Sequence, residues 1–116
     1  MAMTDNTTTA RSCFRAWTER NGDIGGVRAL LTDDMTFRGP LGETNGADEY
    51  VAALDGLSQA VDGAEERAVV ADGDDVCIVY DLSVNGQRIP TVGWYHFREG
   101  RISSVRAFFD PRPMVG

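Results

Sequence analysis

Few side chains in this chain could carry out chemistry. His96 is the one histidine, and histidine is the side chain whose ordinary pKa lies nearest neutrality. By strand alternation His96 shares a face with Trp94 and points away from Tyr95, so we expect a structural or interface role, with a catalytic base as the alternative. Tyr80 and Tyr95 are further catalytic candidates, because a buried phenol needs a hydrogen-bond partner and can orient a carbonyl or hydroxyl group.

The acidic residues favour structural interpretations. Asp72, Asp74 and Asp75 lie close together but lack the ligand spacing of a calcium loop, so they predict a solvated turn. Arg106 and Asp110 lie four residues apart in an alternating run and are expected to form an ion pair on one strand face.

Metal and cofactor chemistry finds no support in the residue types. Cys13 and Cys77 fit no metal or redox spacing and are expected to be buried thiols. One histidine and two distant cysteines cannot assemble a zinc site of nitrogen and sulfur ligands. The chain also lacks a phosphate-binding glycine loop and a G-x-S-x-G nucleophile motif. The sequence therefore predicts no metal and no cofactor.

Length and charge exclude further classes of function. The 116 residues predict a single domain over 1–116, with a frayed N-terminus over 1–8. The formal net charge is −7 and every basic residue is an arginine, which argues against binding nucleic acid or anionic lipid. No apolar run is long enough to span a membrane, and the first ten residues do not resemble a secretory signal. We expect a cytoplasmic protein.

Helical and strand patterns occupy different halves of the chain. Apolar spacing predicts a helix over 10–17, a short helix over 24–31 and a longer helix over 48–61 that Gly63 ends. A short strand over 35–38 falls between the last two. Alternating runs then predict strands over 65–71, 76–84, 88–98 and 101–109, joined by tight turns such as Asn85-Gly86.

This order predicts an α+β fold with helices packed on one face of a curved antiparallel sheet. The strands carry apolar residues on both parities, for example Tyr80 on one face and Val79 on the other. A half-solvated sheet would alternate more cleanly, so both faces are expected to be covered. We expect helices on one face and a second subunit on the other, which would make a homodimer through Val79, Trp94, His96 and Phe108.

Two segments carry a family resemblance. Residues 22–37 contain GD-I…ALLTDD-M-F, and residues 100–111 contain GRI…FFDP. With them the chain resembles the nuclear-transport-factor-2-like superfamily, and within it the small SnoaL-like (polyketide-cyclase-like) proteins, over residues 9–113. The resemblance implies a cone-shaped sheet wrapped around the N-terminal helices, an apolar pocket at its wide end, and dimers through the outer sheet face. The superfamily includes isomerases, cyclases, epoxide hydrolases and non-catalytic binding modules.

The resemblance also implies a set of pocket residues and the loss of one mechanism. Ketosteroid isomerases of the superfamily use an aspartate base and a protonated aspartate beside a tyrosine. The matching positions here are Gly39 and Gly93, so that mechanism is absent. The inward residues expected to bind a ligand are Phe14, Trp17, Phe37, Tyr50, Leu54, Ile78, Tyr80, Tyr95 and Phe109.

The sequence leaves two classes of function open. One is binding of a small, largely apolar organic molecule, with a cofactor-free isomerisation or cyclisation of a polyketide- or terpenoid-like substrate. The other is a non-catalytic ligand-binding or dimerisation module. A catalytic pocket should hold an ionisable group with a strongly perturbed pKa, and the inward positions offer only tyrosines.

Overall fold

The first helix forms where apolar residues recur at helical spacing. α1 (Asn6–Thr18) begins after Asp5, whose carboxylate accepts a hydrogen bond from the Thr7 backbone N–H at 3.1 Å. The computed structural model describes residues 5–115, so residues 1–4 of the predicted frayed segment lie outside it. The prediction is wrong for residues 6–8, because the Asp5 cap lets the helix start there.

A second group of short elements leads into the sheet. Asp23 caps α2 (Ile24–Val27) through the Gly26 N–H, and the 3-10 turn η1 (Arg28–Leu30) follows. β1 (Leu31–Gly39) therefore starts earlier than predicted, with Leu31 in the strand. The four-residue β2 (Gly42–Asn45), which the sequence did not predict, pairs with the end of β1.

The third helix is shorter than its apolar pattern predicted. α3 (Ala47–Ser58) begins after Gly46 and ends before Val61, which already belongs to β3 (Val61–Asp72). Gly63 does not end the helix. It lies in β3 where the register against the next strand shifts, so this glycine marks a β-bulge.

The predicted antiparallel meander is confirmed. β3, β4 (Asp75–Val84), β5 (Gln87–Arg98) and β6 (Arg101–Phe109) pair in sequence order, and the sheet order is β2-β1-β6-β5-β4-β3. The sheet is mixed, because β1 runs parallel to β6. A short helix, α4 (Arg112–Val115), follows the last strand.

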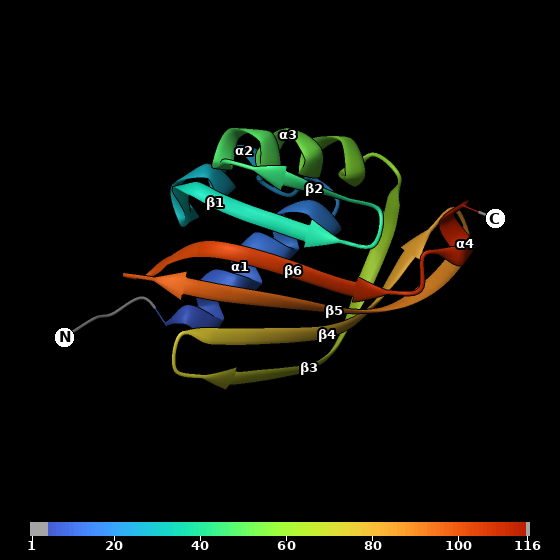
Figure 1. Ribbon diagram of the computed structural model, residues 1–116. Helices are drawn as coiled ribbons and strands as arrows, with labels where there is room; N and C mark the ends of the chain where they lie inside the picture. Colours follow the sequence, from blue (N-terminus) through green and yellow to red (C-terminus); the bar gives the residue numbers. More distant parts are fainter. Residues whose placement is uncertain (1–4, 116) are drawn as a thin grey trace.

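The fold is α+β, with the helices on one side of a curved sheet (Figure 1). α1 contacts β3, β4 and β6, whereas α3 contacts β1 and β2. The core lies between these helices and the sheet and includes Cys13, Leu31, Met35 and Ile78, each 0% exposed. Within residues 5–115 no helix is long and apolar enough to cross a membrane.

Candidate functional site

A cavity of about 320 Å³ lies between α1, α3 and the inner face of the sheet. Its size falls at the lower end of the range usual for small-molecule sites, about 300–1,000 Å³. The wall is aromatic because inward positions of four strands meet the apolar faces of two helices. Phe37 from β1 packs on Tyr50 from α3 with ring centroids 5.6 Å apart, and Trp17 from α1 lies 6.1 Å from Tyr80 of β4.

The structure brings most of the predicted pocket residues to this cavity. Seven of them line it: Trp17, Phe37, Tyr50, Leu54, Tyr80, Tyr95 and Phe109. Phe14 and Ile78 do not. Phe14 packs against Tyr80 at 4.6 Å between centroids, and Ile78 is fully buried. Both belong to the buried core. Strand and helix periodicity separates inward from outward residues but does not separate cavity wall from solid core.

Several wall residues were not predicted. Ile89 and Thr91 of β5 face the cavity, and they share the parity of Gly93 and Tyr95, so simple alternation could have found them. The hairpin that joins β1 to β2 also lines the cavity through Leu41, Gly42, Glu43 and Thr44. No comparable pattern exists there, because β2 has four residues and little apolar content.

Three phenols lie on the cavity wall. Tyr50, Tyr80 and Tyr95 come from three different elements, and their residues are at most 4% exposed. The hydrogen bonds formed by residues 5–115 include none to these hydroxyls. Burial raises the pKa of each phenol above its ordinary value, so all three are protonated at neutral pH.

Charge is almost absent from the wall. Glu43 is the one charged residue among the described residues that line the cavity, and its side chain is 63% exposed. It forms an ion pair with Arg38, with Oε2 3.2 Å from Nε. A carboxylate that is solvated and paired in this way is poorly placed to act as a general base inside the cavity.

Gly39 and Gly93 line the same cavity, and aromatic rings cover both. A Cβ added to Gly39 would lie 3.0 Å from Phe37 Cζ, and one added to Gly93 would lie 3.3 Å from Tyr95 Cε1. An aspartate at either position would need these rings to move. At both positions aromatic carbon occupies the space that a larger side chain would need.

His96 lies on the outer face of the sheet, away from the cavity. Its Nδ1 is 2.8 Å from Asp75 Oδ1, and the same oxygen accepts a hydrogen bond from Trp94 Nε1 at 2.7 Å. These bonds, His96 first, lower the pKa of Asp75. Asp75 is thus part of an outer-face cluster as well as the start of β4.

The predicted ion pair between Arg106 and Asp110 does not form. Arg106 lies over the rings of Trp94 and Phe108, at 5.7 and 5.6 Å from their centroids. Asp110 instead pairs with Arg112, whose Nε is 2.9 Å from its carboxylate, because the strand ends at Phe109 and the chain turns there.

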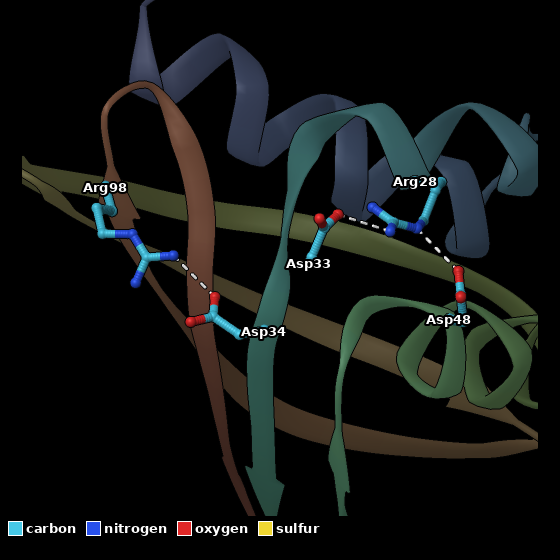
Figure 2. A network of polar contacts seen from close by, with 5 residues as sticks. All are labelled: Arg28, Asp33, Asp34, Asp48 and Arg98. Carbon is cyan, nitrogen blue, oxygen red and sulfur yellow. Dashed lines mark hydrogen bonds and ion pairs between the residues drawn. The ribbon is translucent and has the colours of Figure 1, made fainter.

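A second polar network ties the helices to β1 at the end of the sheet (Figure 2). Arg28 bridges Asp33 of β1 and Asp48 of α3, at 2.8 Å to each, and Asp34 accepts a hydrogen bond from Arg98 of β5 at 2.8 Å. All of these contacts are at the surface. Within residues 5–115 no three His, Cys, Asp or Glu side chains are grouped as a metal site would need.

Solved structures of other proteins share this fold. An NTF2-like protein of unknown function from Cytophaga hutchinsonii superposes with a TM-score of 0.87 at 25% identity, over 99% of this chain and 98% of that one. A ketosteroid isomerase-like protein from Kribbella flavida gives 0.80 at 22% identity, over 94% and 82%. An LEH-like epoxide hydrolase from M. tuberculosis gives 0.74 at 22% identity, over 95% and 86%.

Sequence comparison defines the family. No curated protein matches the chain. The sequence model of the SnoaL-like domain matches residues 10–105, from within α1 to the middle of β6. The chain therefore belongs to the SnoaL-like domain family, within the NTF2-like fold.

Proposed function

We propose that the cavity binds a small, largely apolar organic molecule, of the size and character of a polyketide or terpenoid intermediate. The observation that carries this proposal is the cavity of about 320 Å³ whose wall is aromatic and aliphatic and holds one charged residue at its rim. An apolar ligand that displaces water from such a wall binds favourably, because apolar surface is removed from water.

The wall favours binding over acid–base catalysis. General acid–base catalysis needs a group that can take up a proton near neutral pH, and the three phenols are held protonated by burial. Glu43 is solvated and paired with Arg38. Cofactor-free isomerisation or cyclisation is the second candidate, and it would have to proceed by orientation and exclusion of water alone.

A blocked cavity tests the proposal. Ala53 is an exposed residue of α3 that lines the cavity, and its neighbour Ala52 is exposed but does not line it. We expect native mass spectrometry of the purified protein to detect a co-purified small molecule, and Ala53→Trp to lose it. Ala52→Trp, the matched control, should keep it. Equal ligand content in the two variants would place the ligand elsewhere.

We also propose that a second copy of this chain covers the outer face of the sheet. Two adjacent rows cross that face: Val70, Cys77 and Trp94 in one, and Ala68, Val79, Val92 and Phe108 in the next. Val70 is 61% exposed and Phe108 47%, and exposed apolar side chains in contiguous rows are typical of an interface. A face that packs on itself gives a two-fold dimer.

The mass in solution tests this assembly. Light scattering should give the mass of two chains at micromolar concentration. Phe108→Asp should give one chain, because it would place two carboxylates in an apolar contact. The control Ala52→Asp, on α3, should stay dimeric. A wild-type protein with the mass of one chain would refute the assembly.

A further inference from the structure

The cavity wall offers no cation that could balance an anionic ligand. Among the described residues that line it, Glu43 is the one with a charge, and the other side chains are aromatic, aliphatic or hydroxylic. The hydroxyl of Thr91, which is 4% exposed, donates to the Ile89 carbonyl at 3.0 Å and is therefore already used. A carboxylate or phosphate that entered would lose its hydration without gaining a counter-ion, which costs far more than burying a neutral polar group.

A cation does lie beside the wall, but the protein itself occupies it. Arg38 follows the wall residue Phe37 in β1 and lies opposite Glu43 of β2. Its Nε is 3.2 Å from Glu43 Oε2, and its Nη1 donates to the Phe37 and Thr44 carbonyls at 2.8 and 3.1 Å. Its Nη2 donates to Asn45 Oδ1 at 3.1 Å. All three nitrogens of this guanidinium therefore have acceptors within β1 and β2.

The carboxylate of Glu43 has two effects at the rim of the cavity. It is a negative charge in its own right, so it repels an anion that approaches the wall there. It also neutralises the Arg38 side chain, which is 41% exposed and would otherwise attract an anion to the same place. Because both partners are partly exposed, their pairing contributes little to stability. The pair therefore matters more for which ligands can enter than for folding.

We propose that the cavity accepts neutral ligands and rejects carboxylates and phosphates, and that Glu43 enforces this selection by neutralising Arg38 at the rim. This selection rests on the proposed binding function and narrows its ligand class. Free acids, phosphate esters and diphosphates are excluded, so a polyketide- or terpenoid-like ligand must reach the cavity without an ionised acidic group. Glu43 acts here as a specificity-determining residue.

Two probes of similar shape measure the selection. 2-Acetylnaphthalene is neutral and 2-naphthoate is an anion at pH 7, and each is titrated calorimetrically into the wild type. We expect the carboxylate to bind at least about tenfold more weakly than the ketone. Ala53→Trp, which places an indole in the cavity wall, should abolish binding of the ketone and so locates the probe in this cavity.

Removal of the rim carboxylate tests the role of Glu43. Glu43→Gln should tighten 2-naphthoate by about 2- to 5-fold, the effect of one partly exposed charge, and leave the ketone unchanged. Glu49→Gln is the matched control, because Glu49 is an exposed residue of α3 that does not line the cavity and its loss changes the net charge equally.

A double variant separates the two charges of the rim. Adding Arg38→Met to Glu43→Gln should return the ratio of the two probe affinities to about its wild-type value, because the rim is then neutral again. This ratio is the readout throughout, since a general change in the shape of the mouth would weaken both probes alike.

The outcomes separate this selection from the function on which it rests. If the wild type binds 2-naphthoate in the cavity as tightly as the ketone, the charge selection is wrong while apolar binding stands. If Glu49→Gln shifts the ratio of affinities as much as Glu43→Gln, the net charge of the molecule decides and the role of Glu43 is wrong. If the ketone does not bind at millimolar concentration, the proposed function fails, and the selection fails with it.

Discussion

Gly39 and Gly93 line the cavity, at the positions where the resemblance to ketosteroid isomerases leads us to expect acidic groups. The ring of Phe37 packs against Gly39 and the ring of Tyr95 against Gly93, so aromatic carbon occupies the space that a side chain there would need. The nearest carboxylate on the wall, that of Glu43, is exposed and paired with Arg38. The described residues of the cavity wall therefore provide apolar surface and neutral hydrogen-bonding groups, but no carboxylate placed to act as a base.

We predict that the protein does not isomerise a Δ5-3-ketosteroid at a rate comparable with the true isomerases. The reaction needs a carboxylate within reach of the α-proton, and loss of a general base alone costs about 100- to 10,000-fold in rate. Formation of the conjugated enone, followed by its absorbance, is the measurement. Rapid saturable turnover that survives Asp34→Asn and His96→Ala would show that the assignment of Gly39 and Gly93 to the acid positions is wrong.

The sequence predicted wall residues best where alternation is regular. Tyr80 and Tyr95 could be placed inward because β4 and β5 pair without a register shift across the stretch that carries them. Thr44 and Glu43 could not be placed, since the hairpin that carries them is positioned by its pairing with β1 and not by its own apolar pattern. Phe14 has the same periodicity as Trp17, so the helical pattern does not distinguish Phe14, which lies in the core, from Trp17, which lines the cavity.

The start of α3 depends on backbone geometry that few residues can adopt. Gly46 precedes the helix with φ 94° and ψ 149°, a region essentially restricted to glycine, and no side chain caps the helix there. Its N–H donates to the Met35 carbonyl of β1 at 2.7 Å, so this conformation fixes the helix to the sheet. The network of Arg28 with Asp33 and Asp48 holds the same junction from outside.

We predict opposite effects for two glycine substitutions, one directly before α3 and one within it. Gly46→Ala should lower the free energy of unfolding by about 1–3 kcal/mol, because alanine is strained at that φ. Gly56→Ala, within α3 where a Cβ meets nothing within 4 Å, should raise it by about 0.5–1 kcal/mol through helix propensity. Urea unfolding at constant m-value measures both. A stabilising Gly46→Ala would mean that α3 begins with a different backbone conformation.

The ends of helices and strands were predicted well where the residues of a local turn determine them. The turns Asn85-Gly86 and Glu99-Gly100 have positive φ at both residues, and the strands around them were predicted to within one residue. The end of α3 was misplaced because Val61 continues the helical apolar spacing. What ends the helix is the pairing of Val61 with Val84, a contact between residues far apart in the sequence.

All three tyrosines and Cys13 are buried in the same hydrophobic core of the molecule. The tyrosines are Tyr50, Tyr80 and Tyr95, each buried by α1, α3 and the sheet together. Burial raises the pKa of every one of these phenols and raises the pKa of Cys13 from 9.0 to about 12. The ionisation of any of them is therefore linked to unfolding of the whole core.

We predict that the protein loses stability as the pH rises above 9 and that its phenols ionise only when it unfolds. Between the unfolded and folded pKa values the folded state holds more protons, so the free energy of unfolding falls with pH, by up to about 1.4 kcal/mol per pH unit for each group. The stabilising contribution is complete below pH 9, the ordinary pKa of the first group to titrate. Phenolate absorbance near 295 nm and far-ultraviolet circular dichroism, followed together in an alkaline titration, should change in one transition. None of the three tyrosines of the chain is exposed. Phenolate absorbance that develops near pH 10 while the circular dichroism is still native would therefore contradict the prediction, because it would show that at least one phenol is open to bulk solvent.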